Sequence, residues 1–221
     1  MKILSIETTS DRASVAYLEQ DKILAEAVIE ERLIAKDTLL ANVRKVLSAG
    51  GASLNDINLV VCGVGPGSFT GIRLGIAFIK GIVTGIEKLE TCGVISNDSI
   101  GFSCVSEEYS SSKNIMSIVD SKTGRSYVRK YSSRGEPLGE INLLPNEEIK
   151  RESTGFYPVG IFSKKLENTF AEKRIIWPDA GVSGKMAFKG MGNINIKPYI
   201  SIISQLISIA IELIVKSQVA R

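Results

Sequence analysis

The glycine-rich run at residues 63–71 constrains the fold more than any other part of the sequence. It follows an apolar run at residues 57–62, which is typical of a central strand buried on both faces. It leads into residues 71–86, where the pattern predicts a helix. Glycines permit positive φ and close backbone approach, and Ser68 or Thr70 can cap the helix. The run therefore joins a buried strand to a helix through a tight turn.

A helix N-terminus also favours an anion, so this turn has a second interpretation as a phosphate cradle. Its spacing, however, matches neither the Walker A motif nor the dinucleotide-binding fingerprint. We therefore favour a structural turn and keep phosphate binding as the alternative.

The helix that follows the turn is apolar on nearly every side. Its apolar residues are Ile72, Leu74, Ile76, Ala77, Phe78, Ile79, Ile82, Val83 and Ile86. Such a helix must be buried, either inside its own fold or against another chain. Its glycines lower helix propensity but permit close approach of a second helix; they are Gly71, Gly75, Gly81 and Gly85. A protein–protein interface and an internal core are equally favoured.

The first half of the chain predicts the order βββαβαβ. The expected strands and helices lie at residues 2–6, 13–18, 23–30, 35–47, 57–62, 71–86 and from 93 onward. This is the order of a ribonuclease-H-like lobe, the repeat unit of the actin, Hsp70 and sugar-kinase architecture. We expect an α/β protein in which mixed sheets are flanked by helices.

The second half repeats this order only loosely and is expected to form a reduced lobe. Its expected strands lie at 115–119, 126–131, 157–161 and 174–177, with a helix at 164–172. A polar, serine-rich stretch at 106–113 suggests a boundary. We expect a first lobe at residues 1–103, a second lobe at 104–197, and a C-terminal helix at 198–221 that packs on either lobe.

Composition narrows the class of protein. The chain has no histidine, which excludes Ser-His-Asp triads, Cys-His nucleophiles and histidine-ligated metals. The three cysteines lack C-x-x-C spacing and fit a reducing cytoplasm. A net charge of +3 is too small to indicate nucleic-acid binding by electrostatics alone. Residues 199–215 are apolar but interrupted by polar residues, so we expect a cytoplasmic protein without a membrane span.

The glycine run belongs to a longer motif. Residues 65–81 are similar to the signature G-P-G-S-F-T-G-[IL]-R-x-G-x-A-x-x-K-G of the TsaB (YeaZ) family. Residues 6–10 and 14–16 resemble the first hairpin of that family, and residues 120–127 weakly resemble its Asp-Ala-Arg…Val-Tyr segment. The agreement is convincing over residues 1–95.

This resemblance implies an actin/Hsp70-like fold and a non-catalytic subunit in tRNA threonylcarbamoyladenosine modification. It implies dimerisation with a TsaD-like catalytic subunit that carries the metal and modifies the adenosine next to the anticodon. A TsaE-like ATPase would complete the complex, and tRNA would be contacted indirectly. We expect a homodimer in isolation and no tightly bound cofactor, with ATP and Mg²⁺ at the complex interface.

The resemblance also assigns site residues. The partner-binding residues are Asp37, Leu40, Val43, Leu47, Ile72, Arg73, Ile76, Ile79, Lys80 and Val83. By analogy with ATPases of this fold, the candidate nucleotide-binding residues are Glu7, Thr8, Thr9, Gly65, Gly67, Ser68 and Thr70. No catalytic residue and no metal ligand is assigned. The His-Ser pair common in the family at the first interface helix is replaced here by Asp37-Thr38.

Two other functions remain open. One is a small active ATPase or kinase that uses Glu7 and Asp120 with Mg²⁺, with a nucleotide loop formed by Gly181, Gly184, Gly190 and Gly192. The other is a self-associating structural protein that uses the same apolar helix. Under the preferred function, Ile79→Glu is expected to abolish partner association while leaving the monomer folded.

Overall fold

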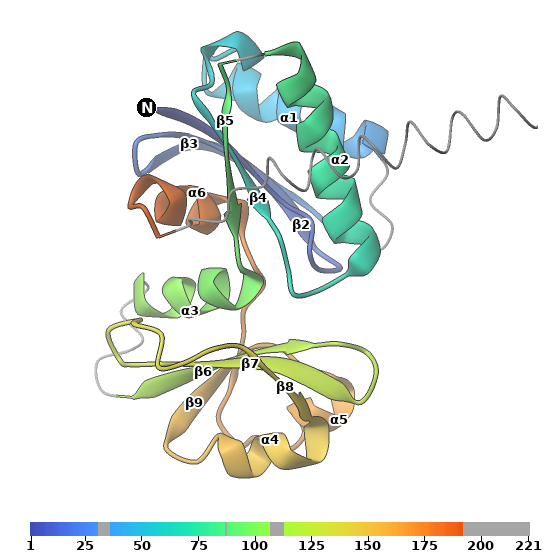
Figure 1. Cartoon of the computed structure of the whole chain (residues 1–221), viewed down its shortest axis with the longest axis vertical. Helices are drawn as coiled ribbons and strands as arrows, with labels where there is room; N and C mark the ends of the chain where they lie inside the picture. The colour runs from blue at the N-terminus through green and yellow to red at the C-terminus, as the bar shows by residue number, and fades with distance from the viewer. Residues whose placement is uncertain (31–35, 87, 107–112, 192–221) are drawn as a thin grey trace, which may run out of the picture.

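The computed structural model describes residues 1–30, 36–86, 88–106 and 113–191, which form two stacked five-stranded sheets with helices around them (Figure 1). The first sheet contains β1 (Lys2–Glu7), β2 (Ala13–Glu19), β3 (Lys22–Ile29), β4 (Leu59–Gly63) and β5 (Glu90–Val94). The second contains β6 (Asn114–Asp120), β7 (Arg125–Tyr131), β8 (Asn142–Pro145), β9 (Phe156–Ile161) and β10 (Arg174–Ile175).

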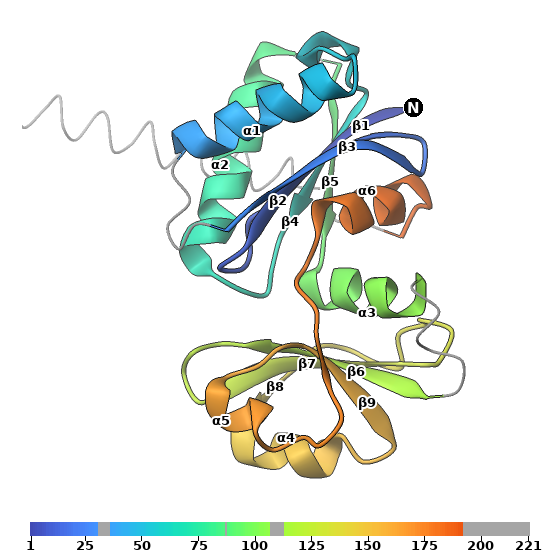
Figure 2. The same ribbon diagram turned by 180° about the vertical axis from the view of Figure 1, so that it is seen from behind.

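The first sheet has the strand order β3-β2-β1-β4-β5. The first three strands pair antiparallel, as the predicted meander requires, and β4 joins β1 in parallel. Helices α1 (Lys36–Ala49) and α2 (Phe69–Gly85) cover one face of this sheet, while α6 (Ala180–Phe188) covers the other (Figure 2). The sheet is therefore buried on both faces, which explains why β4 is nearly continuously apolar and why β1 is buried from Ile3 to Glu7.

The second sheet repeats this topology with the order β10-β9-β6-β7-β8. Helix α3 (Ser96–Ser106) packs on one face, and α4 (Asn146–Glu152) and α5 (Lys164–Glu167) pack on the other. Each sheet places a meander beside two parallel strands, so the two halves share one topology, while the second half is reduced to shorter outer helices and a two-residue edge strand. The shared topology confirms the two-lobed ribonuclease-H-like fold.

Sequence reasoning missed the elements that give the second half its full repeat. It predicted no strand at β8 and no helix at α3 or α4, because β8 and α4 are short and the hydrophobic pattern of α3 is weak. The helix predicted at residues 164–172 ends at Glu167 instead. The predicted C-terminal helix at 198–221 lies outside the described residues. The boundary at residue 103 stays a prediction; α3 crosses it.

Helix α6 corrects one further expectation. Gly181 and Gly184 lie within this helix rather than in a nucleotide loop. An added Cβ at Gly184 would lie 2.5 Å from Leu18 Cδ1, and one at Gly181 would lie 2.5 Å from Ile23 Cδ1. These glycines therefore let α6 approach the first sheet closely. Among the residues described, no helix is both long enough and apolar enough to cross a membrane.

Candidate functional site

The glycine turn packs directly on the hairpin between β1 and β2. The Ser68 N–H donates to the Thr9 carbonyl oxygen at 2.6 Å, and the Thr8 hydroxyl donates to the Gly71 carbonyl oxygen at 2.8 Å. An added Cβ at Gly67 would overlap the Thr9 carbonyl oxygen, and one at Gly71 would overlap that of Thr8. These glycines are required by close backbone contact, so the turn is a structural junction between hairpin and helix.

The candidate nucleotide-binding residues come together, but they contact one another. Thr8 and Thr9 are buried, and the Thr9 hydroxyl shares a hydrogen bond of 2.8 Å with the Ser96 hydroxyl. Ser68 caps α2 by accepting from the Gly71 N–H at 3.2 Å. Thr70 is exposed within the first turn of the helix. The hydroxyl groups of Thr8, Thr9 and Ser68 thus all form hydrogen bonds within the chain itself.

Glu7 is fully buried beneath this junction, and burial raises its pKa to about 7. Its Oε1 accepts from the Thr9 N–H at 2.7 Å, whereas its Oε2 has no hydrogen-bond partner within the described part of the chain. Asp120 occupies the equivalent position at the end of β6, and its Oδ1 is likewise buried and unpartnered there. No cluster of three or more metal-ligating side chains occurs among the described residues. Glu7 and Asp120, which sequence reasoning paired, thus end equivalent strands of the two sheets, and neither lines any of the cavities described below.

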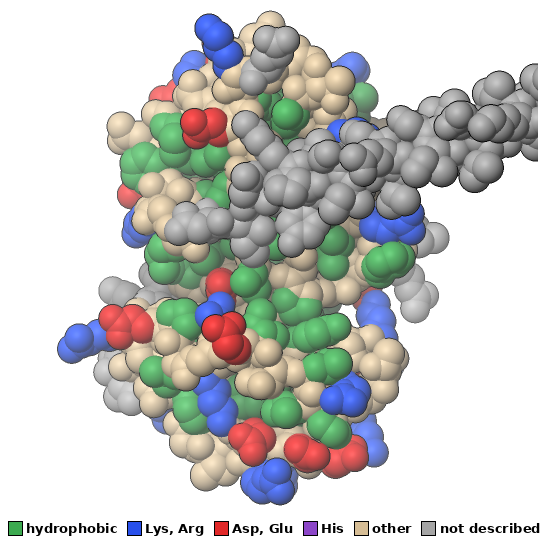
Figure 3. All heavy atoms as spheres, in the orientation of Figure 1, with side chains coloured by type: hydrophobic (Ala, Val, Ile, Leu, Met, Phe, Trp, Pro, Cys, Tyr) green, Lys and Arg blue, Asp and Glu red, His purple; other side chains and the backbone are tan. Residues whose placement is uncertain are grey.

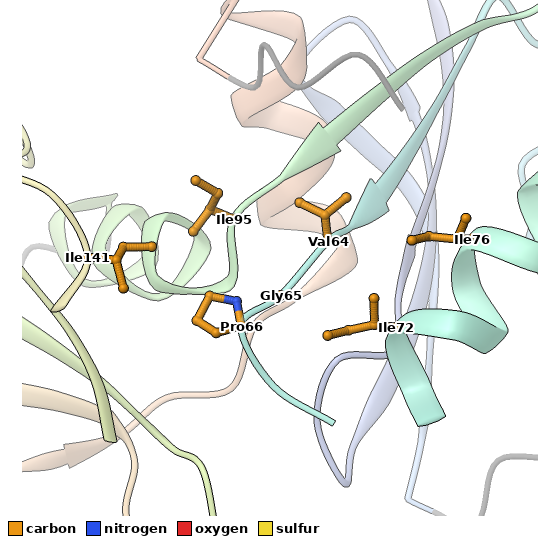
Figure 4. A pocket seen from close by; sticks show the side chains of 7 residues that line it. All are labelled: Val64, Gly65, Pro66, Ile72, Ile76, Ile95 and Ile141. Atoms are coloured by element: carbon orange, nitrogen blue, oxygen red, sulfur yellow. The ribbon is translucent and has the colours of Figure 1, made fainter. Parts of the chain in front are cut away.

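A cavity of about 340 Å³ lies beside the glycine turn, at the junction of the two sheets. In Figure 4, Ile141 lies on one side of Pro66, while Ile72 and Ile76 of α2 lie on the other. The remaining lining residues are Val64, Gly65 and Ile95. Hydrophobic side chains also gather along this junction on the face seen in Figure 3. The lining is apolar, so this cavity suits a hydrophobic group and not a phosphate.

A larger groove of about 680 Å³ runs along the outer side of α2. We call it the α2 groove; it is lined by Leu40, Leu54, Asn55, Leu74, Ala77, Phe78, Gly81, Ile82, Gly85 and Ile86. None of these residues carries a charge. The six from Leu74 to Gly85 recur at the helical spacing of three or four residues, so they form one stripe. Leu74, Phe78 and Ile82 are half-buried against the first core, whereas Ala77, Gly81 and Gly85 are exposed, so the stripe lies at the edge of the packed face of α2.

The four glycines of α2 fall into two classes. Gly71 and Gly75 face the chain's own hairpin, where an added Cβ at Gly75 would lie 2.6 Å from the Thr8 hydroxyl oxygen. Gly81 and Gly85 face open space, with no atom within 4 Å of an added Cβ among the residues described. Close packing against the hairpin requires the first pair, whereas no contact among the described residues requires the second.

The predicted partner-binding residues are divided between the core and the surface. Val43, Leu47, Ile76 and Ile79 are buried in the first core, so they are not accessible to a partner and are corrected here as core residues. Ile72, Lys80 and Val83 are half-buried, and Asp37, Leu40 and Arg73 are exposed. The residues divide in this way because α1 and α2 each pack one stripe of apolar residues onto the sheet, while the residues on their other sides stay accessible.

The burial of Ile79 changes the expected effect of the substitution proposed for it. Its side chain has an exposed fraction of 0%. A carboxylate there would be desolvated without a partner, so Ile79→Glu would unfold the first core. Nine residues of the α2 groove were not among the predicted partner-binding residues, although they are more accessible to a partner than Ile79: Leu54, Asn55, Leu74, Ala77, Phe78, Gly81, Ile82, Gly85 and Ile86. The spacing of Gly81 and Gly85, four residues apart, was the feature of the sequence that could have pointed to this face of the helix.

A further exposed aromatic stands at the start of α2. Phe69 has an exposed fraction of 72%, and the Arg73 guanidinium lies over its ring at 5.2 Å from the centroid. Leu40, which lines the α2 groove, is also exposed, at 39%.

Comparison with known proteins shows which families this chain resembles. The family model for TsaD, described as tRNA N6-adenosine threonylcarbamoyltransferase, matches residues 35–215. The chain is 31% identical over 193 residues to the tRNA threonylcarbamoyladenosine biosynthesis protein TsaB of Buchnera aphidicola subsp. Schizaphis graminum, covering 80% of this chain and 89% of that protein. It is 38% identical over 87 residues to TsaB of Escherichia coli K12, covering 39% of this chain and 37% of that protein.

Among solved structures, YeaZ from Pseudomonas aeruginosa superposes with a TM-score of 0.71 at 19% sequence identity. The superposition covers 89% of this chain and 96% of that one. At this identity the likeness establishes the fold alone.

Proposed function

The chain belongs to the TsaB (YeaZ) family of tRNA threonylcarbamoyladenosine biosynthesis proteins, and on this basis we propose that it docks a TsaD-like catalytic subunit. It supports threonylcarbamoyl transfer as an accessory subunit and supplies no catalytic residue. The docking surface is the α2 groove together with the exposed residues at its edge.

The observation that carries this proposal is the open space at Gly81 and Gly85. Gly81 lies inside α2, where glycine lowers stability by about 0.5–1 kcal/mol relative to alanine, whereas Gly85 is the last residue of the helix, where glycine is common. No close contact of this chain accounts for glycine at either position among the residues described. Glycines four residues apart on one helix face instead permit another helix to approach closely, which supports a partner helix lying across α2.

The chemistry of the groove defines the partner surface. An uncharged groove of about 680 Å³ favours the apolar face of an amphipathic helix. The match to the TsaD family model over residues 35–215 supports a partner of the same fold, which would present its own equivalents of α1 and α2. The two subunits would then pack these helices against each other. A TsaE-like ATPase, indirect tRNA contact, and ATP with Mg²⁺ at the interface stay predictions.

Gly81→Glu tests the docking surface without disturbing the core. The added side chain meets open space in the monomer, so the variant is expected to fold as well as the unmodified chain. A carboxylate in the uncharged groove would be desolvated by the partner, so we expect binding to a TsaD-like protein from the same genome to weaken by about a hundredfold or more. Calorimetric titration of the two purified proteins measures this change.

Thr154→Glu is the matched control, because it adds the same charge at an exposed position after α4, on the second lobe. It is expected to leave the affinity unchanged. If Gly81→Glu bound the TsaD-like protein as tightly as the control, the α2 groove would not be the interface.

A functional assay separates docking from catalysis. Threonylcarbamoylation of tRNA by the TsaD-like protein is expected to require this chain and to fall with Gly81→Glu. If the purified chain formed a stable homodimer that Gly81→Glu disrupted, and no TsaD-like protein bound, the self-associating structural role would replace this proposal.

A further inference from the structure

A second cleft, of about 340 Å³, lies on the other side of the junction between the sheets. It is lined by Arg12, Ser14, Glu26, Ser103, Arg174, Ile175, Ile176, Trp177, Pro178, Asp179 and Val182. These residues come from β2 and β3 with the turn before them, from α3, and from the segment that runs from β10 into α6. Unlike the apolar cavity beside Pro66, this cleft brings together two carboxyl groups and two guanidinium groups.

The carboxyl groups are held in place by the first turn of α6. The Gly181 N–H donates to Glu26 Oε1 at 3.3 Å, and the Val182 N–H donates to Asp179 Oδ1 at 3.1 Å. The Ala180 N–H donates to the Ser14 hydroxyl at 2.8 Å. The N–H groups of this helix terminus are therefore used by the fold and do not remain for an anion. Their effect is to fix two carboxyl groups beside each other.

Gly181 is the residue that makes this arrangement fit. An added Cβ would lie 3.1 Å from Glu26 Oε1 and 3.2 Å from Asp179 Oδ1, besides its overlap with Ile23. The two carboxyl groups thus converge on a backbone position without a side chain. Although Glu26 as a residue is exposed, its carboxyl end lies against α6.

The electrostatics of the pair follow from this proximity. Partial desolvation and the neighbouring Asp179 carboxyl, to which Glu26 is hydrogen-bonded, raise the pKa of Glu26 to about 7, while Arg12 acts in the opposite direction. Near neutral pH Glu26 therefore holds a proton in part of the molecules, and a positively charged nitrogen can replace it. Arg12 and Arg174 line the same cleft and can attract a negative group.

This combination restricts the ligand. Two guanidinium groups disfavour a metal cation, and two carboxyl groups disfavour a simple anion. We propose that the cleft binds a small zwitterion of the α-amino-acid class, with its ammonium group at Glu26 and Asp179 and its carboxylate at Arg12 and Arg174. The volume is at the small end of ligand sites, which fits an amino acid better than a nucleotide. Trp177 and Val182 supply apolar contacts for the ligand's side chain.

Calorimetric titration of the full chain with each of the twenty L-amino acids tests this proposal, with acetate and methylammonium as probes that carry one charge only. At least one amino acid is expected to bind, and to bind more tightly than either single-charge probe. Binding should release protons near pH 7, measured by repeating the titration in buffers of different ionisation enthalpy. The affinity should rise as pH increases through about 7, because Glu26 loses its proton.

Glu26→Gln is expected to weaken this binding by about tenfold or more and to abolish the proton release. Glu30→Gln is the matched control, since Glu30 is exposed just beyond β3 and does not line the cleft. If Glu26→Gln failed to fold, as judged by circular dichroism, Arg12→Gln would take its place and should weaken binding of the carboxylate end.

Absence of binding by every amino acid, or binding that none of these lining substitutions changed, would overturn the proposal. The experiment uses this chain alone, so its outcome is independent of whether a TsaD-like partner docks on the α2 groove.

Discussion

Gly71 and Gly81 lie on the same helix, and the same substitution at each should change stability in opposite directions. At Gly71 an added Cβ would overlap the Thr8 carbonyl oxygen. This oxygen belongs to the backbone and cannot move aside as the end of a flexible side chain could, so the hairpin or the helix must shift. Such a shift would also strain the 2.8 Å hydrogen bond from the Thr8 hydroxyl to the Gly71 carbonyl.

The magnitudes follow from these contacts. Overpacking costs about 1–3 kcal/mol, and a backbone obstacle places Gly71→Ala at the upper end. Replacing glycine in a helix returns about 0.5–1 kcal/mol. The net loss for Gly71→Ala is therefore about 2 kcal/mol. At Gly81 only the favourable contribution remains, since the position faces open space, so Gly81→Ala gains about 0.5–1 kcal/mol.

Equilibrium unfolding in urea, followed by circular dichroism, measures both values. The two variants should differ by about 3 kcal/mol, or by about 6–12 °C in thermal midpoint for a chain of this size. If Gly71→Ala were as stable as the unmodified protein, the turn would not depend on close backbone contact, and the structural explanation of the motif would fail.

Three further substitutions test one buried and one partly buried carboxyl group, Glu7 and Asp98. Burial raises the pKa of Glu7 from 4.5 to about 7, so the folded protein holds this proton more tightly than the unfolded chain does. As pH rises between these two values, the free energy of unfolding should therefore fall by about 3 kcal/mol relative to that of Glu7→Gln. Urea unfolding of both proteins at a series of pH values measures this change. A constant difference would show that Glu7 keeps one protonation state. Asp98 accepts from Arg129 Nη1 at 2.7 Å and from the Tyr131 hydroxyl at 2.6 Å, so Asp98→Ala should cost about 3 kcal/mol. Asp98→Asn, which keeps an acceptor, should cost less; an equal loss would contradict this account.

Much of the first lobe was predictable because its elements carry strong local signals. The meander was indicated by apolar strands separated by polar turns, and the two helices by their periodicity. The second lobe was harder, because β8 and α4 are short and amphipathic patterns need length to be recognised. The family signature at residues 65–81 needed no structure at all.

The candidate site shows a different limit. Periodicity identified α2 as apolar on nearly every side, but it could not say which side faced the sheet. Ile79 and Phe78 are neighbours in sequence and equally apolar, yet Ile79 is fully buried while Phe78 lines the α2 groove. That choice depends on how the helix is rotated against β4, which is set by the contacts of Gly71 and Gly75 with Thr8.

The sequence by itself determined the family, the order of elements in the first lobe and the position of the glycine turn, since each is encoded in residues close together along the chain. Only the tertiary structure decided which apolar side chains were left for a partner, and that Glu26 of β3 meets Asp179 before α6. Such contacts join residues far apart in sequence, and burial is a property of the packed chain rather than of any local pattern.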